Sequence, residues 1–433
     1  MMISVLVLTS FRVSPAQNSS VPVTNSPIAP TPVNLPSGAN SPIAPTPVNY
    51  STNLPEATTT AAPAAGLNPL TMSANDLAAW GYPPQPDPNA APQAYAVWVQ
   101  AVTAAQTRIF PWLVRSNRAH GPTVGSQSID LTNSTPAVAS VVNSALGSYN
   151  WSGYLNTNTN GAVFTSVFAQ YVVPRAQQAA GTCTGAWDYS STWVGLDGAG
   201  AGANDVLQAG TYADAYCGAS GESDDGDDSS GSQTTDTNYS AWYEWYPMNA
   251  ANISGLRIKP GDNMFVEVWS TSPTTGGVFV VDLNTRKYVS VNLTAPDGVQ
   301  VAGGSAEWIV ECPSISGSLT TLTNYTSEYV SGAYAVDSNG TTYAPAASTP
   351  VVMVDQNMGR SLIRPCLEQT PCRFRTPARR QRVHSDNVSV RATQPAASLH
   401  LMGTGTLCSG QAGKSCPGTR HEAFEAFRGL LQA

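Results

Sequence analysis

Ten short segments between residues 148 and 355 alternate apolar and polar side chains, and turn dipeptides such as Asp-Gly, Asn-Gly and Gly-Gly separate most of them. A period of two places successive side chains on opposite faces of a β-strand, and these dipeptides favour tight turns. Because no helical spacing lies between the segments, we expect an all-β domain, an antiparallel β-sandwich. The expected strands are Ser148–Asn156, Ala162–Val173, Ser190–Gly198, Asp205–Gly210, Tyr239–Pro247, Met264–Ser270, Gly277–Leu283, Lys287–Thr294, Ser305–Glu311 and Thr349–Asp355.

The charge of the chain changes twice along its length. Residues 1–120 carry a net charge of +1, residues 121–360 carry −15 and residues 361–433 carry +6. The acidic middle argues against a nucleic-acid partner, since phosphate binding requires clustered Lys and Arg. It is typical of a protein that works in acid, where protonation relieves repulsion, but also of a secreted protein kept soluble by its charge.

The first 67 residues predict export and a spacer rather than a fold. Residues 1–17 contain a short apolar run that resembles a weak secretory signal, so we expect a secreted protein. Residues 18–67 are rich in Pro, Ser and Thr and repeat NSPIAPTPVN, which predicts an extended linker. No segment approaches the roughly 20 apolar residues that span a bilayer, so we expect no membrane partner.

Residues 68–145 predict two short helices ahead of the β domain. Ser73 is a candidate N-cap for a helix over Ala74–Ala79, and apolar residues at helical spacing predict a second helix over Pro92–Ile109. Such a segment could be a pro-segment that covers a cleft until it is removed. It could equally be a small packing domain that stays attached.

The tail at residues 361–433 differs from everything before it. It is basic, contains four of the seven cysteines and lacks the alternation of the β domain at 146–360. One interpretation is a tail that binds an anionic partner; the other, which we favour, is a shifted reading frame near Arg360. Upstream, the acidic run Gly221–Gly231 does not match the EF-hand spacing, so we favour disorder over a calcium loop there.

The cysteine pattern contains no C-x-x-C pair and therefore gives no zinc-ribbon or thioredoxin signal. Cys183 and Cys217 flank the segments around Thr192–Gly210. In an oxidising compartment they would form a disulfide across that region, whereas Cys312 has no obvious partner.

Histidine is missing from the whole region expected to form the sandwich. The four histidines are at positions 120, 384, 400 and 421. A Ser-His-Asp or Cys-His arrangement and an HExxH zinc site therefore cannot be built within that region. If the sandwich is an enzyme, carboxylates must supply its acid–base chemistry and amides or hydroxyls its polarising groups, with no metal and no cofactor.

Carboxylates within apolar strands are the candidates for that chemistry, because burying a charge without a partner is costly. Alternation places Glu307 and Glu311 on one face of their strand, and Trp242, Glu244 and Tyr246 on one face of another. A lone strand glutamate can also lie on a solvated face, and a strand glutamine can simply bond a neighbour. The full candidate set is Asp197, Glu244, Glu267, Glu307 and Glu311, with Gln208 as the candidate amide.

Five segments in this order resemble the glutamic peptidases, the eqolisin or scytalidoglutamic peptidase-like family. They are NWSGY at Asn150–Tyr154, WVGLDG at Trp193–Gly198, VLQAG at Val206–Gly210, AWYEWYP at Ala241–Pro247 and AEWIVE at Ala306–Glu311. The region Asn68–Asn117 resembles the segment ahead of the catalytic domain in bacterial-type members.

The resemblance implies a sandwich of two seven-stranded antiparallel sheets with Gln208 and Glu311 as the catalytic pair. It implies a monomeric acid endopeptidase, insensitive to pepstatin, that acts on polypeptides without a cofactor. Glu311 would activate a water and Gln208 would stabilise the oxyanion. Substrate-binding residues of the family correspond to Trp193, Asp197, Gly198, Trp242, Glu244 and Tyr246.

Three features depart from the family, and two other functions remain open. Family precursors often carry a basic pro-segment that releases in acid, whereas the region ahead of this sandwich has few basic residues. The last strand of the family domain has no clear counterpart from Ser361 onward, and an acidic residue after the Gln is either replaced by Thr211–Tyr212 or displaced to Asp214. A β-sandwich glycoside hydrolase could pair Glu244 with Glu311, using tryptophans as sugar platforms. A carbohydrate-binding module would use the same aromatic residues without catalysis.

Overall fold

The computed structural model describes residues 49–124, 127–130, 144–157, 161–179, 183–199, 204–219, 233–326, 328–354, 361–363, 366–367 and 388–391. The chain divides into two units, residues 1–46 and 47–433, and every described residue belongs to the second. The signal-like segment, the Pro-rich repeats, the acidic run at 221–231 and nearly all of the tail lie outside the described residues.

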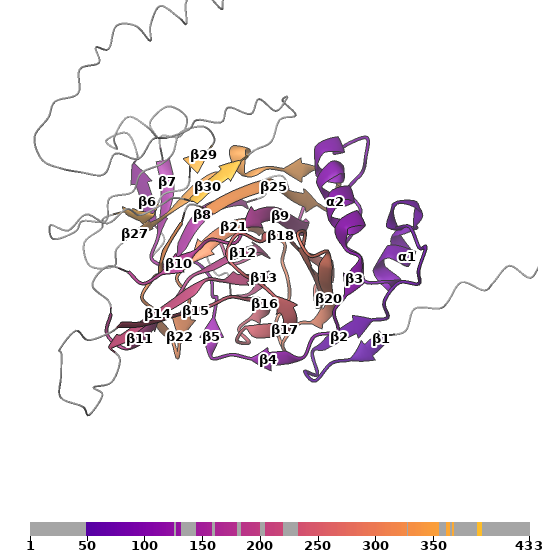
Figure 1. Cartoon of the computed structure of the whole chain (residues 1–433). Coiled ribbons are helices and arrows are strands. Elements are labelled where there is room, and N and C mark those ends of the chain that lie inside the picture. Colours follow the sequence, from indigo (N-terminus) through magenta and orange to yellow (C-terminus); the bar gives the residue numbers. More distant parts are fainter. Residues whose placement is uncertain are drawn as a thin grey trace, which may run out of the picture. The chain divides into compact units, whose positions relative to one another are not determined.

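Two large sheets, here called sheet A and sheet B, form the body of this unit (Figure 1). Sheet A has the order β1 (Asn49–Ser51), β2 (Ala57–Thr60), β20 (Lys287–Thr294), β19 (Thr275–Asp282), β18 (Asn263–Ser272), β9 (Phe164–Val172), β25 (Glu328–Asp337), β30 (Val388–Arg391) and β29 (Cys366–Leu367), with β26 (Thr342–Tyr343) on β25 and β3 (Thr107–Arg108) on β20. Sheet B has the order β4 (Leu113–Arg115), β17 (Ala251–Arg257), β16 (Ser240–Tyr246), β13 (Val206–Tyr212), β12 (Ser191–Leu196), β21 (Ser305–Glu311), β8 (Trp151–Thr157), β27 (Thr349–Val354), β7 (Ser144–Ser148) and β6 (Gln127–Asp130), with β28 (Ser361–Ile363) on β27.

The core between the sheets follows from alternation along their strands. In sheet A, Val266 and Val268 of β18 point into it, and in sheet B, Leu207 and Trp308 do the same. All four are buried, and they belong to one apolar cluster. The residues between them in sequence point to the outer faces, so each sheet carries a second set of side chains outside the sandwich.

The two helices cover the outer face of sheet A. Helix α1 (Ala74–Ala79) begins at the expected cap, where the Ser73 hydroxyl accepts a hydrogen bond from the Asp76 N–H at 3.1 Å. Helix α2 (Pro92–Ala104) buries Trp98 in a cluster with Phe265 and other aromatic residues of sheet A (Figure 1). It ends five residues earlier than the expected Ile109, because Thr107–Arg108 leave the helix to pair with β20 as strand β3.

All ten expected strands are present, and the predicted fold class is confirmed. The expected count of seven strands per sheet is wrong, since each sheet has eleven among the described residues. The flanking chain supplies five strands of sheet A (β1, β2, β3, β29 and β30) and four strands of sheet B (β4, β6, β7 and β28). The tail was not expected to supply strands, yet β28, β29 and β30 lie within residues 361–391.

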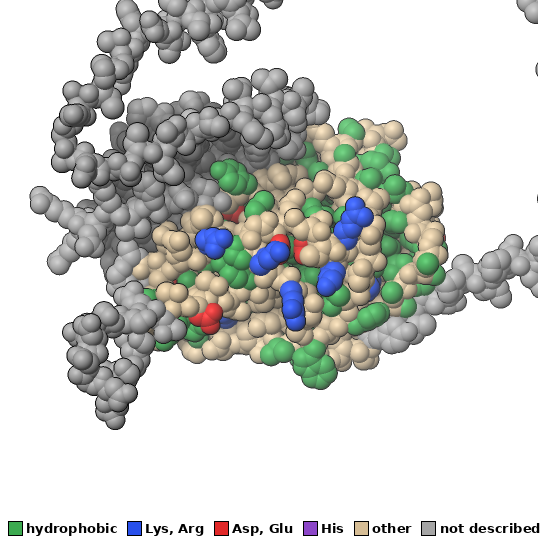
Figure 2. Space-filling view, in the orientation of Figure 1, with side chains coloured by type: hydrophobic (Ala, Val, Ile, Leu, Met, Phe, Trp, Pro, Cys, Tyr) green, Lys and Arg blue, Asp and Glu red, His purple; other side chains and the backbone are tan. Residues whose placement is uncertain are grey.

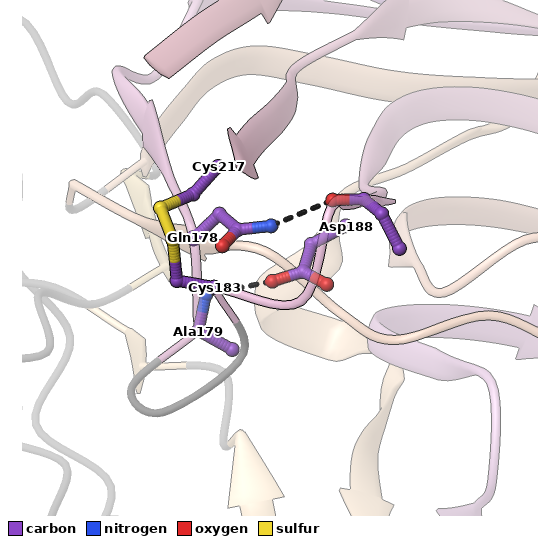
Figure 3. The surroundings of a disulfide bond; sticks show 6 residues. Gln178, Ala179, Cys183, Asp188 and Cys217 are labelled. Atoms are coloured by element: carbon purple, nitrogen blue, oxygen red, sulfur yellow. Dashed lines mark hydrogen bonds between the residues drawn. A yellow bond between two sulfur atoms is a disulfide. The ribbon is translucent and has the colours of Figure 1, made fainter. Parts of the chain in front are cut away.

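Three small sheets lie beside the two large ones. The first joins β11 (Ala186–Asp188), β14 (Asp214–Ala219) and β15 (Gln233–Asn238); the second joins β10 (Ala176–Gln177) to β24 (Asn324–Tyr325); the third joins β23 (Ser318–Leu319), β22 (Ser314–Ile315) and β5 (Arg118–Ala119). The expected Cys183–Cys217 disulfide is confirmed and ties the first of these sheets (Figure 3). Gln178 holds the same region by donating to the Ala186 carbonyl at 2.8 Å.

Much of the acidic excess of the sequence is inside the protein. Twelve of the 21 acidic residues in 121–360 are buried, so the sequence charge overstates the surface charge. Lys and Arg side chains accordingly stand out on the face drawn in Figure 2. The buried acids are Asp188, Asp197, Asp205, Asp214, Glu244, Asp262, Glu267, Asp282, Glu307, Glu311, Glu328 and Asp337. Within the described part of the chain, no helix has the length and apolarity to cross a membrane.

Candidate active site

The outer face of sheet B brings the predicted glutamine and three of the candidate glutamates onto one surface. Gln208 on β13 pairs in register with Glu244 on β16 and with Gly195 on β12, and Gly195 pairs with Glu307 on β21. Glu311 lies four residues further along β21 and therefore on the same face. All four side chains are at most 1% exposed, so the alternation predicted from sequence describes a buried polar surface.

Glu311 is held by two side-chain donors. Its Oε1 accepts a hydrogen bond from Asn150 Nδ2 at 3.1 Å, and its Oε2 accepts one from Trp193 Nε1 at 2.8 Å. Burial raises the pKa of Glu311 well above its ordinary value, and the two donors act in the opposite direction because they favour the ionised carboxylate. A carboxylate with two fixed donors has one orientation and remains able to accept a proton.

Gln208 directs its amide toward a backbone carbonyl of the chain itself. Its Nε2 donates to the carbonyl oxygen of His120, while its Oε1 accepts no hydrogen bond from the described residues. Gly195 makes room for this arrangement, since a Cβ there would lie 2.8 Å from the Trp193 ring and 3.2 Å from Gln208 Cβ. The indole that donates to Glu311 thus packs directly beside the glutamine.

Glu244 also binds His120, through both the backbone N–H and the imidazole of that residue. Its two oxygens accept the His120 N–H at 3.1 and 3.0 Å, and Oε2 lies 2.9 Å from His120 Nδ1. The imidazole stacks on Trp242 with ring centroids 3.9 Å apart and an angle of 11°. Burial lowers the pKa of His120 and raises that of Glu244, so both groups favour the neutral state.

Residues 118–124 continue across this face on both sides of His120. On one side, β5 pairs with β22, and Arg118 forms hydrogen bonds of 3.0 and 2.6 Å with the carboxylate of Asp214. Asp214 is one of the two alternatives given above for the acidic position after the glutamine, and its partner is a cation from the region ahead of the sandwich. This ion pair fixes residues 118–124 at the start of β14.

On the other side of His120, the segment is held through backbone groups. Asn150 Nδ2 reaches the Pro122 carbonyl at 3.4 Å, and Asn150 Oδ1 accepts the Val124 N–H at 2.9 Å. The Thr123 N–H donates to the Gly198 carbonyl at 3.2 Å. Asn150 therefore contacts both the segment and Glu311. The expected active site on sheet B is therefore covered by residues 118–124. Helices α1 and α2, by contrast, cover sheet A.

Five of the six expected substrate-binding residues contact this segment or Glu311. Trp193 binds Glu311, Gly198 binds Thr123, and Trp242 and Glu244 bind His120. The ring of Tyr246 lies beside Gly121, where an added Cβ would be 3.1 Å from it.

Asp197, the sixth of these residues, binds a neighbouring turn. Its carboxylate accepts the N–H groups of Ala302, Gly303 and Gly304 at 2.7, 3.0 and 2.6 Å, and its φ is +69°. It therefore holds a turn beside the site.

Glu307 and Glu267, the other two sequence candidates, lie in separate surroundings. Glu307 is influenced by Asp197 and Asp205, and burial raises its pKa well above the ordinary value. Burial also raises the pKa of Asp205 to about 7. Glu267 lies on the outer face of sheet A, paired in register with Phe279 and Phe168.

His120 is the contact that sequence reasoning missed. It was counted only as a histidine outside the sandwich, and it is fully buried against the predicted site. No histidine shows on the face drawn in Figure 2. Its signal in the sequence was weak: it is the one histidine before the tail, and it follows Arg118 and precedes Gly121-Pro122. Across the described residues, no group of three or more His, Cys, Asp or Glu side chains is arranged to hold a metal ion.

Residues 149–364, half of the chain, match the model of the Peptidase A4 family. Among solved structures, scytalido-glutamic peptidase with a transition state analog inhibitor is 23% identical, with a TM-score of 0.38, over 49% of this chain and 91% of that one. Aspergilloglutamic peptidase from Aspergillus niger is 28% identical, with a TM-score of 0.31, over 40% of this chain and 91% of that one. No curated protein matches the sequence.

Proposed function

This chain belongs to the Peptidase A4 family, the glutamic peptidases, and on that premise we propose that it hydrolyses peptide bonds with Gln208 and Glu311. One observation carries the assignment of residues: the Gln208 amide donates to a peptide carbonyl on the face where Glu311 lies. An amide N–H directed at a carbonyl oxygen is what stabilising an oxyanion requires. Glu311 supplies the only further group this chemistry needs, a carboxylate that can take and return a proton.

The proposed reaction uses one water and no covalent intermediate. The Glu311 carboxylate takes a proton from the water, whose oxygen attacks the carbonyl carbon of the substrate. Gln208 Nε2 donates to the oxyanion, and Gln208 Oε1 is free to orient the water. Protonated Glu311 then delivers its proton to the leaving nitrogen as the C–N bond breaks. The products are a carboxylic acid and an amine.

We propose that this reaction runs in acid. The reaction needs Glu311 as a carboxylate first and as an acid second, so its rate depends on a pKa near the working pH. Burial raises that pKa, and hydrogen bonds from Asn150 and Trp193 lower it. When a substrate peptide replaces residues 118–124, water reaches the site and burial raises the pKa of Glu311 less. Glu311 then titrates nearer to the ordinary value for glutamate, about 4.3.

We further propose that the protein is a secreted, monomeric endopeptidase that pepstatin does not inhibit. The Cys183–Cys217 disulfide supports an oxidising compartment. The His120 contacts support an extended polypeptide as the substrate, because a backbone carbonyl, a backbone N–H and a side chain are all bound.

Digestion of a denatured protein at about pH 4 with pepstatin present tests the assignment. Wild type is compared with Gln208→Ala and Glu311→Gln, and each variant is checked for folding by its near-UV circular dichroism. We expect the loss of the amide to lower kcat/KM by about 10²- to 10³-fold. Folded variants that digest the substrate at the wild-type rate would refute the catalytic pair, and cleavage of polysaccharide alone would favour the glycoside hydrolase.

A further inference from the structure

Residues 118–124 bind to the site in the way that an extended peptide binds to a protein. Strand β5 adds to β22, and the N–H groups of Thr123 and Val124 and the carbonyl of Pro122 bind sheet B and its neighbouring residues. Most of these contacts are with backbone groups, as in recognition by strand addition. The segment is thus held at both ends while its middle crosses the catalytic face.

At the middle of the segment, the side chain of His120 fills a specific position. The imidazole lies on Trp242 and near Tyr212, at centroid distances of 3.9 and 5.6 Å, and Nδ1 is within 2.9 Å of Glu244. The residue that follows is glycine, and the ring of Tyr246 lies close to it. These contacts fix the rotation of the peptide plane between His120 and Gly121.

The carbonyl of that peptide plane is the one that Gln208 binds. The His120 carbonyl accepts a hydrogen bond from the amide of Gln208, the proposed catalytic glutamine. The Pro122 carbonyl, two residues later, accepts one from Asn150 instead. An amide that stabilises an oxyanion acts on the carbonyl whose carbon is attacked. The geometry therefore distinguishes one bond within the segment.

We propose that the bond between His120 and Gly121 is a bond that the protein cleaves in itself. This inference rests on the proposed function, because it uses the same residues and the same water. The water oxygen adds to the His120 carbonyl carbon, Gln208 stabilises the oxyanion, and Glu311 passes the proton from the water to the Gly121 nitrogen. The C–N bond breaks, leaving a carboxylic acid on His120 and an amine on Gly121.

Cleavage would convert a bound segment into two ends that leave the site. The new carboxylate at His120 would lie beside Glu244, whose two oxygens already accept the His120 N–H at 3.1 and 3.0 Å. A carboxylate left in a buried site without a cation beside it is unfavourable, which favours departure of the new chain end. Residues 1–120 would still contact sheet A through α1 and α2, so release of the site does not require release of the helices.

The test is incubation of the full chain between about pH 3 and pH 7, followed by intact mass and N-terminal sequencing of the products. We expect a product that begins at Gly121 and a complementary product that ends at His120. Glu311→Gln is expected to stay uncut under the same conditions. Appearance of the Gly121 terminus at the wild-type rate in Glu311→Gln would overturn the proposal, since another protease would then be responsible.

A peptide with the sequence of residues 116–124 provides a second measurement that does not depend on the folding of a variant. We expect the incubated protein to cut it between its His and Gly, and to cut the His120→Ala peptide at least about tenfold more slowly, because stacking and the Glu244 contact are lost. Equal rates for the two peptides would contradict the assigned position of the imidazole.

The same preparation is tested on a denatured protein, which separates the two proposals. If it digests that substrate while the full chain stays intact or is cut only at other bonds, the self-cleavage proposal is overturned and the proposed function stands. If it digests neither, both are overturned.

Discussion

The outer faces of sheets A and B both bury a glutamate, in different surroundings. On sheet B, Glu311 has donors from Asn150 and Trp193. On sheet A, Glu267 lies on the face that aromatic residues and helix α2 cover, and neither of its oxygens has a hydrogen-bond partner among the described residues. Burial raises the pKa of both carboxyls well above the ordinary value.

Because both carboxyls are buried, hydrogen-bond donors are what distinguish the proposed base, Glu311, from Glu267. Burial alone disfavours the charged form, so Glu267 favours the neutral, protonated state. The donors to Glu311 favour its charged form and also fix its orientation. The local sequences, FVEVW and WIVE, do not reveal this difference, because both place a glutamate among apolar residues.

The largest expected effect compares the two glutamates directly. We expect Glu311→Gln to lower kcat/KM on a denatured protein by about 10³-fold, since the group that transfers the proton is lost. The matched variant Glu267→Gln is expected to stay within about twofold of wild type, because Glu267 lies on the outer face of sheet A, away from the proposed site on sheet B. A comparable loss in both folded variants would remove the distinction between the faces.

The next effect concerns stability. The native state keeps Glu267 protonated while the unfolded chain ionises it, so this residue costs stability as the pH rises above about 4.5 and none below it. We expect Glu267→Met to raise the free energy of unfolding by up to about 3 kcal/mol at pH 7, and much less at about pH 4. Urea unfolding at both pH values measures this. A gain that does not change with pH would mean that better packing, not the removed carboxyl, is responsible.

A smaller effect is expected at Asn150. Asn150→Ala removes a donor that lowers the pKa of Glu311, so that pKa rises and the acidic limb of the kcat/KM profile moves to higher pH. We expect a loss of about tenfold at acid pH. Asn156→Ala is the control, since Asn156 Nδ2 donates to the Ser348 hydroxyl at 3.1 Å and does not contact Glu311. An unshifted limb in Asn150→Ala would show that the hydrogen bond does not tune Glu311.

The smallest effect is expected for Trp193→Phe. This change removes the Nε1 donor to Glu311 Oε2 and keeps an aromatic ring beside Gln208. We expect a few-fold loss and a shift of the acidic limb in the same direction as in Asn150→Ala. A shift toward lower pH would contradict the role of the indole as a donor to the carboxylate.

Alternation made most of the fold predictable, and the exceptions have local causes. The ten expected strands and the shared face of Gln208, Glu244, Glu307 and Glu311 follow from a period of two. Strands β17 and β25 were missed because Ser-Gly pairs interrupt their apolar pattern. The end of α2 was misplaced because pairing with β20 competes with the helix after Ala104.

The sequence by itself determined the fold class, the disulfide, and a restricted set of residues able to carry acid–base chemistry, because these depend on side-chain type and short-range periodicity. Only the tertiary structure decided which glutamate receives donors, that Asp197 holds a turn, and that His120 lies against Gln208. Gln208 and His120 are 88 residues apart in the chain. Contacts of that range arise from how strands pack and pair, and no local pattern encodes them.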